Sequence, residues 1–336
     1  MPVSEALRSF GPGWFGTVMG TGAVVLVAHP FFPGLSAVLH PLNALLMAVL
    51  VGVWLWRCLR LPHAVAEATA HPVQANFYPM LYIALMVVAN QFAVVGEQRG
   101  LALVLWCVGT LLAFAFSYLL LGRLFRSEQV ALEHVTPANY LPAVGLVLVP
   151  VVGARFIEGA RELEQQALMV LNLMALGTGA LMYVALLSLT VHKYLLHRRV
   201  TGPLAATVWI QLAPTGLVPL AAMKLVAAHP HWAGLAGAVE LGSALVVGFG
   251  LWWLGMALSL TVAAMRQGEL PFALSWWAFT FPLGALTLAL QALAMSTGWA
   301  LFSAIAFGGC CVLVCAWSLV ALRTVHGVAT GALLKA

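Results

Sequence analysis

The sequence predicts an all-α integral membrane protein: one transmembrane domain, residues 1–336, whose ten transmembrane helices form five helical hairpins. Three observations lead to this fold class: the composition, the lengths of the apolar segments and the positions of the prolines. Of the 336 residues, 63% are hydrophobic and 7% are charged, whereas roughly 25% are charged in an ordinary soluble domain. Because so few charged side chains cannot cover a soluble fold, a lipid bilayer must solvate the remaining surface.

Ten apolar segments are long enough to cross the ~30 Å hydrocarbon layer of a bilayer. They lie at about 13–28, 42–60, 77–95, 101–125, 136–153, 168–196, 203–228, 235–265, 273–295 and 301–323. The first segment is short and follows Arg8, as a signal peptide would. No small-residue cleavage site follows it, and Gly13, Gly16 and Gly20 suit close helix packing. We therefore expect it to remain as the first helix.

The basic residues predict the orientation. With a cytoplasmic N-terminus, the cytoplasmic segments hold Arg8, Arg57, Arg60, Arg123, Arg126, Lys193, Arg198, Arg199, Arg266, Arg323 and Lys335. The external segments hold only Arg99, Arg155, Arg161 and Lys224. This asymmetry follows the positive-inside rule, so we expect both termini in the cytoplasm and an external loop from Arg155 to Glu164.

The prolines distinguish odd from even helices. The predicted helix kinks are Pro79, Pro142, Pro214, Pro219 and Pro282, all in odd-numbered helices. Within their predicted bounds the even helices contain no proline. A proline frees a backbone carbonyl, which neighbouring helices or a wet cavity can satisfy but lipid cannot. We therefore predict that the odd helices form a central pore and that the even helices form an outer ring.

Neutral polar residues are the candidates for the pore lining. They are Thr17, Thr21, Asn90, Asn139, Gln211, Thr215, Thr280 and Thr287. Within their predicted bounds the odd helices contain no Asp, Glu or His, although cation channels use carboxylate rings and proton-coupled carriers use titratable relays. Hydroxyls and amides can solvate a small anion weakly. The alternative is that each residue only joins neighbouring helices by hydrogen bonds.

Two charges are predicted near one membrane surface, Lys224 late in the seventh helix and Glu240 early in the eighth. One possibility is that they form an ion pair, which offsets the free-energy cost of placing both charges in the membrane. The other is that Lys224 lies in a vestibule of the pore and attracts anions there.

Other classes of function lack the residues that they need. The five cysteines have no CxxC spacing and the paired histidines have no third ligand, so we expect no metal site. No nucleophile, base and orienting group occur together, so we expect neither an enzyme nor a cofactor. The basic residues form no stripe, which argues against nucleic-acid binding.

Four motifs carry a resemblance to a known family. They are GWFGTVMGTGA from Gly13, HPVQANFYP from His71, TPANYLPAVG from Thr136 and SWWAFTFPLGAL from Ser275. Together and in this order they resemble the tellurite-resistance/dicarboxylate transporter family, which includes bacterial tellurite-resistance channels, plant guard-cell slow anion channels, malate permeases and sulfite efflux proteins. The resemblance implies five hairpins around a pore, a homotrimer with one pore per subunit, and a location in a bacterial inner (plasma) membrane. It also implies a phenylalanine gate, which falls on Phe281, or in a second register on Phe279.

The resemblance leaves the transported anion open. The MGTG of the first helix is similar to the malate and sulfite branch, whereas HPVQANF is similar to the plant channels. The first hypothesis is passive, channel-like conduction of small anions such as chloride or nitrate through a Phe-gated pore. The second is a carrier or exporter of C4-dicarboxylates such as malate, of sulfite or of tellurite-type oxyanions, and a third, from another class, is a membrane enzyme or assembly scaffold.

Overall fold

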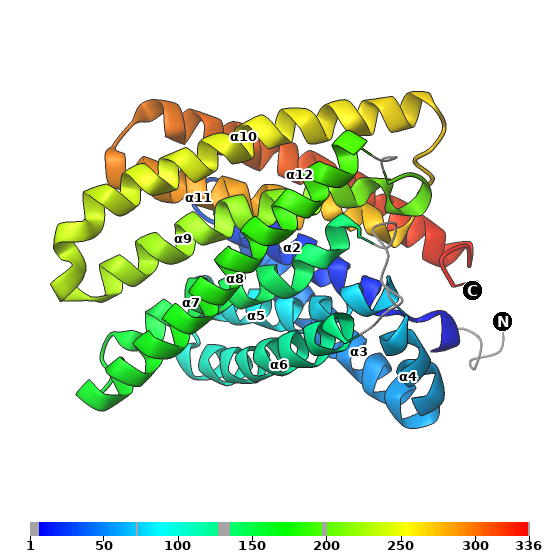
Figure 1. The fold of residues 1–336 in the computed structure, drawn as a ribbon, viewed down its shortest axis with the longest axis horizontal. Coiled ribbons are helices and arrows are strands. Elements are labelled where there is room, and N and C mark those ends of the chain that lie inside the picture. Colours follow the sequence, from blue (N-terminus) through cyan, green and yellow to red (C-terminus); the bar gives the residue numbers. More distant parts are fainter. Residues whose placement is uncertain (1–6, 72, 127–134, 197–199, 335–336) are drawn as a thin grey trace.

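The computed structural model describes residues 7–71, 73–126, 135–196 and 200–334. Throughout these residues the regular structure is helical. Three residues of the orientation argument, Arg198, Arg199 and Lys335, lie outside the described ranges. Both ends of the described chain lie at the same end of the molecule, opposite the turns that join α7 to α8 and α9 to α10 (Figure 1).

The helices divide into two sets by burial. Five core helices are α2 (Phe15–Ala28), α5 (Pro79–Val94), α7 (Leu141–Ile157), α9 (Leu212–Ala228) and α11 (Phe281–Thr297). Five peripheral helices are α3 (Pro33–Arg60), α6 (Arg99–Phe125), α8 (Glu162–Leu196), α10 (Ala236–Arg266) and α12 (Ala300–Ala329). A short helix, α4 (Pro62–Ala70), follows α3.

In the described ranges, nine helical segments are long and apolar enough to cross a membrane, and Pro12–Ala28 is a shorter apolar helix. The prediction of an all-helical membrane protein is confirmed, with about nine or ten long apolar helices where ten were predicted. The buried share is 61–94% in the four long core spans and 22–33% in the five peripheral spans, and every residue of α2 is buried. The peripheral helices therefore expose the apolar surface that lipid must cover.

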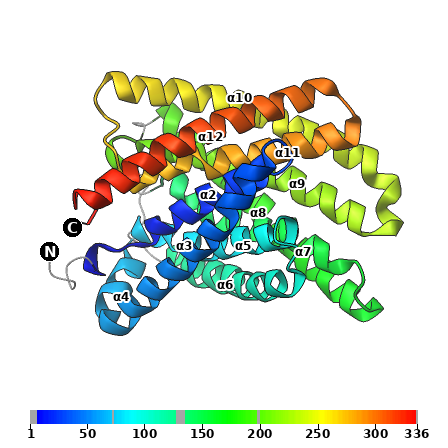
Figure 2. The same cartoon turned by 180° about the vertical axis from the view of Figure 1, so that it is seen from behind.

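The core helices contact one another in a closed cycle. α2 packs against α5, α5 against α7, α7 against α9, α9 against α11, and α11 against α2. Each core helix also packs against the peripheral helix that follows it in the chain. Figure 2 shows the last such pair, α11 and α12, beside α2, so the end of the chain closes the cycle against its beginning.

A 3-10 helix precedes each core helix. These segments are η1 (Pro12–Trp14), η2 (Gln74–Phe77), η4 (Pro137–Tyr140), η5 (Gly202–Gln211) and η7 (Leu274–Phe279). A sixth, η6 (Pro230–Leu235), precedes α10.

This arrangement corrects the predicted kinks. Pro79, Pro142 and Pro282 lie at the first or second position of α5, α7 and α11, where a missing N–H breaks no helical hydrogen bond. These prolines begin helices instead of kinking them, and Pro214 also lies in the first turn of its helix, α9. Pro219 is inside α9, as predicted.

Two further expectations were wrong because helix bounds differ from those predicted. α3 begins at Pro33, well before residue 42, so Pro41 lies inside a peripheral helix. α7 continues to Ile157, so Arg155 belongs to its last turn and not to a loop. α8 begins at Glu162, which leaves only residues 158–161 between the two helices.

Candidate functional site

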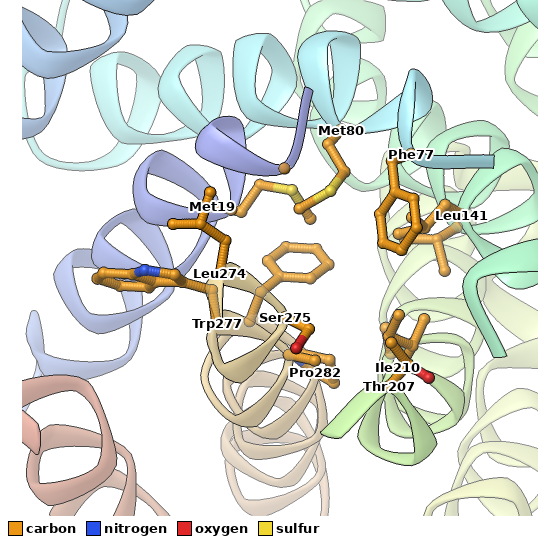
Figure 3. Close-up of a pocket in the computed structure, with 16 residues that line it drawn as sticks. Met19, Phe77, Met80, Leu141, Thr207, Ile210, Leu274, Ser275, Trp277 and Pro282 are labelled. Carbon is orange, nitrogen blue, oxygen red and sulfur yellow. The ribbon is translucent and has the colours of Figure 1, made fainter. Parts of the chain in front are cut away.

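The first of three cavities, the proximal cavity, lies at the first turns of the core helices. It has a volume of about 50 Å³ and every core helix contributes to its lining. One residue from each, in chain order, is Gly16, Met80, Val144, Ala213 and Phe281. Figure 3 shows further lining side chains, among them Phe77, Leu141, Ile210 and Trp277, which surround this space from several helices. Among the described residues its lining contains no titratable side chain, and its polar side chains include Thr207 and Ser275.

The second, the middle cavity, has a volume of about 20 Å³. Its lining again includes one residue from each core helix: Ala23, Val87, Leu148, Leu217 and Ala285. Within the described part of the chain, Asn90 is the only polar side chain in this lining. An anion in the middle cavity would therefore meet mainly apolar groups.

The third, the distal vestibule, has a volume of about 870 Å³ and lies near the last turns of the core helices. Leu26, Asn90, Arg155, Lys224 and Gln291 line it, each from a different core helix. The peripheral helix α10 adds Glu240. In every core helix the residue numbers rise from the proximal cavity through the middle cavity to the vestibule. The five helices therefore run in the same direction, and the three cavities follow one another along them.

Neighbouring cavities share lining residues. Phe281 lines both the proximal and the middle cavity, so it lies between these two spaces. Leu26, Asn90 and Leu288 line both the middle cavity and the distal vestibule. Asn90 is 4% exposed, and its Oδ1 has no hydrogen-bond partner among the described residues.

The two phenylalanines proposed for the gate have different surroundings. Phe281 is the first residue of α11 and is 6% exposed. Phe279 lies in the preceding 3-10 helix and lines none of the three cavities. Its ring packs edge-on against Trp209 and Trp276, at centroid distances of 5.2 and 5.6 Å. The geometry therefore favours the register in which Phe281 faces the series of cavities.

Of the eight predicted lining residues, Asn90 alone lines any of these three cavities. The hydroxyls of Thr17, Thr215, Thr280 and Thr287 donate to carbonyls three or four residues earlier, at 2.7–2.8 Å. Thr21 accepts a hydrogen bond from Trp317 Nε1 of α12, Gln211 Oε1 accepts one from the Tyr140 hydroxyl, and Asn139 Oδ1 caps η4. These seven side chains thus take part in helix contacts and caps, although Gln211 Nε2 is buried without a hydrogen-bond partner among the described residues.

Lys224 and Glu240 line the same vestibule but form no ion pair in the described structure. Lys224 Nζ instead donates to the carbonyl oxygen of Val151 at 2.9 Å. Arg155 joins them in the vestibule, although the sequence argument placed it in a loop. The apolar pair Phe156–Ile157 directly after it is the signal that the helix continues.

These features define a multi-pass helical membrane protein with a series of cavities along its buried core. Comparison with known proteins agrees: residues 9–325 match the family described as voltage-dependent anion channel (SLAC1). The chain belongs to this family, and the resemblance to the tellurite-resistance/dicarboxylate transporters is confirmed. Anion transport is therefore the function of its family, which is one of channels and transporters and not of enzymes.

Three relatives show the range of this similarity. An uncharacterized transporter of Methanocaldococcus jannaschii is 30% identical over 98% of both chains. A sulfite efflux pump of Trichophyton rubrum is 27% identical over 98% of this chain and 94% of its own. A malic acid transport protein of Schizosaccharomyces pombe is 20% identical over 84% of this chain and 70% of its own.

Proposed function

We propose that the five core helices enclose a pore that conducts small monovalent anions of the chloride and nitrate class passively, and that Phe281 closes it. The observation that carries this proposal is the position of Phe281 between the proximal and the middle cavity. The core helices are the odd members of five consecutive hairpins, and the peripheral helices form the outer ring.

The charge of the lining favours anions over cations. The described residues that line the proximal and middle cavities include no carboxylate that could replace the water around a cation. All five core helices begin near the proximal cavity, so the partial positive ends of their dipoles lie on that side. A neutral, weakly polar path of this kind allows an anion to pass without being held tightly.

The closing element is an aromatic ring. A phenylalanine in a narrow passage excludes water, so an anion there must lose hydration that only ring edges and backbone dipoles can replace. Asn90 is the polar group between the middle cavity and the distal vestibule. Lys224 and Glu240 act as vestibule charges. Thr17, Thr21, Asn139, Gln211, Thr215, Thr280 and Thr287 then support the wall of the pore.

The alternative is a carrier or exporter of C4-dicarboxylates such as malate, of sulfite or of tellurite-type oxyanions. Two observations support it: the names of the fungal relatives, a sulfite efflux pump and a malic acid transport protein, and a distal vestibule of about 870 Å³, far larger than a chloride ion requires.

The assembly that we propose is a homotrimer in a bacterial plasma membrane, with one pore per subunit and both termini cytoplasmic. In this orientation the proximal cavity lies toward the cytoplasm and the distal vestibule lies toward the outside. The excess of Lys and Arg in the predicted cytoplasmic segments supports the orientation.

The test is anion flux through purified protein in proteoliposomes under a set voltage, for wild type, Phe281→Ala and Phe279→Ala. We expect Phe281→Ala to lower the free-energy barrier to anion passage by about 1.4 kcal/mol or more, which corresponds to an anion flux about tenfold higher or more. Cations should stay excluded, and the matched control Phe279→Ala should change flux little.

Thermal unfolding of both variants separates gating from packing. If the Phe281 side chain only fills the protein core, Phe281→Ala leaves a cavity that lowers the free energy of unfolding by about 3–5 kcal/mol, and anion flux does not rise. A stable Phe281→Ala protein with unchanged flux would remove the gate. Saturation and counterflow of malate or sulfite, without voltage-driven chloride current, would instead establish the carrier.

A further inference from the structure

The Trp277 side chain lies in the wall of the proximal cavity, close to the proposed gate. Trp277 belongs to η7 and precedes Phe281 by four residues, and both side chains line this cavity. Figure 3 shows Trp277 among the side chains that surround the space. The residue is 4% exposed, so its neighbours decide where the indole can be.

The first of these neighbours is the peripheral helix α12. Trp277 Nε1 donates a hydrogen bond to Thr324 Oγ1 of α12 at 3.1 Å. The Thr324 hydroxyl in turn donates to the carbonyl oxygen of Val320 at 2.8 Å, which leaves its lone pairs free to accept from the indole. Trp277 is therefore tied to a helix that lines none of the three cavities.

The second neighbour is the core helix α2, which presents two glycines to Trp277. A Cβ on Gly16 would lie 3.1 Å from the Cβ of Trp277, and a Cβ on Gly20 would lie 2.6 Å from its ring. A side chain at Gly20 would collide with the indole, so the ring packs directly against the backbone of α2. Trp277 is thus held between α2 and α12.

The backbone of Trp277 is connected to the beginning of α11. Its carbonyl oxygen accepts hydrogen bonds from the Thr280 N–H at 3.1 Å and from the Thr280 hydroxyl at 2.7 Å. Thr280 directly precedes Phe281, and the Thr280 carbonyl accepts from the Gly284 N–H at 2.9 Å. A shift of Trp277 therefore moves the turn from which the Phe281 side chain projects.

The volumes of the cavities show that Phe281 needs such a shift in order to leave the passage. A cavity of about 150 Å³ holds a benzene ring, whereas the proximal and middle cavities have volumes of about 50 and 20 Å³. Neither space accepts the Phe281 ring unless one of its walls moves. Trp277 is the wall residue that hydrogen bonds connect to the turn carrying Phe281.

We propose that Trp277 is a positioning residue for Phe281, and that the hydrogen bond from Trp277 to Thr324 keeps the passage closed. While this bond is intact, the indole occupies the space beside Phe281 and fixes the turn that begins α11. Loss of the bond frees the indole and opens the passage, so a movement of α12 controls closure. The proposal deepens the proposed function and rests on it, because Trp277 acts through Phe281.

The experiment is chloride flux in proteoliposomes under a set voltage. Trp277→Phe removes the N–H and keeps an aromatic ring, and Thr324→Val removes the acceptor and keeps the shape of the side chain. Each should raise flux about fivefold, the factor that corresponds to one typical hydrogen bond. The double variant should gain no more than either single one, since both remove the same bond. Thr324→Ser keeps the hydroxyl and should retain wild-type flux.

The matched control is Trp317→Phe, which removes a hydrogen bond of the same kind from the same peripheral helix. Trp317 Nε1 donates to Thr21 Oγ1 of α2 at 3.0 Å, and Trp317 lines none of the three cavities. Its flux should equal that of the wild type, whereas thermal unfolding should show a similar loss of stability in Trp317→Phe and Thr324→Val. An equal rise of flux in both would reduce the effect to general loosening of α12 and overturn the proposal.

The Phe281→Ala background tests whether Trp277 acts through Phe281. Without the ring there is nothing to position, so adding Thr324→Val should raise flux no further; another fivefold rise would contradict the proposal. Unchanged flux in a stably folded Thr324→Val protein would also overturn it, and this variant decides the question if Trp277→Phe does not fold. A higher flux in Phe281→Ala would then leave the gate standing. No rise in Phe281→Ala itself is the separate result that removes the gate, and the positioning role with it.

Discussion

The two ends of the core differ in space and in charge. The proximal cavity has a volume of about 50 Å³ and a lining with several aromatic and sulfur-containing side chains. The distal vestibule has a volume of about 870 Å³ and contains Arg155, Lys224 and Glu240. The same five helices form both ends, so the difference comes from side chains and from the 3-10 segments that precede the core helices. We therefore propose that closure and the attraction of anions take place at opposite ends of the core.

The largest effect that we expect from this difference is in thiol reactivity. With the native cysteines replaced, Met223→Cys in the vestibule should react quickly with an impermeant anionic thiol reagent applied outside oriented vesicles. Met80→Cys faces the proximal cavity and should react about a hundredfold more slowly from that side, because an opening of about 3 kcal/mol must come first.

Equal rates at the two positions from the outside would contradict a closed proximal end. Fast labelling of Met223→Cys only from the cytoplasmic side would reverse the orientation, since the Lys and Arg distribution predicts that the vestibule lies outside.

A smaller effect concerns packing. A Cβ on Gly20 would lie 2.6 Å from the Trp277 ring and would also meet the Thr280 hydroxyl. A Cβ on Gly237, near the vestibule, would meet nothing within 4 Å. Gly20→Ala should therefore cost about 1–3 kcal/mol of stability through overpacking, whereas Gly237→Ala should be neutral or slightly stabilising, since alanine favours helix.

Thermal unfolding of the two alanine variants, with anion flux measured beside it, checks this contrast. Equal stability of both proteins would mean that the proximal end is not tightly packed, and the explanation of its small volume would fail.

For proton coupling we expect no effect: a pH gradient should not drive anion transport. In the ranges that the structure describes, the linings of the proximal and middle cavities contain no titratable side chain that could carry a proton with the anion. A pH gradient with the voltage held at zero should therefore drive no uphill uptake of nitrate. Nitrate is the required solute because a weak acid could carry its own proton, and accumulation of nitrate would favour the carrier.

The sequence predicted ten apolar helices in the order in which they occur, because a membrane span needs a long apolar run wherever it lies; in the described residues nine of them are long and the first is shorter. Their ends were less predictable. Pro41 and Arg155 were placed outside helices, yet α3 begins earlier and α7 ends later than the apolar runs suggested. Both residues are exposed yet lie within helices, so the end of an apolar run does not mark the end of a helix.

Which side chains face the cavities could not be predicted. All residues of α2 are buried, so no polar stripe identifies the side of this helix that faces the axis. Thr215 and Thr287 illustrate the problem, because their hydroxyls bond within their own helices and lie against Gly250 of α10 and Gly309 of α12. Glycines of the peripheral helices make room for these threonines, and only three-dimensional packing reveals that pairing.

The central claim is that Phe281 is the barrier between two cavities of one anion path. Single-channel recording in planar bilayers, with unequal chloride concentrations, tests it on the series Phe281→Leu, Phe281→Val and Phe281→Ala. We predict conductance that rises as the side chain becomes smaller, a reversal potential near that of chloride throughout, and no such trend at Phe279. Equal conductance across a series of stably folded Phe281 variants would contradict the claim.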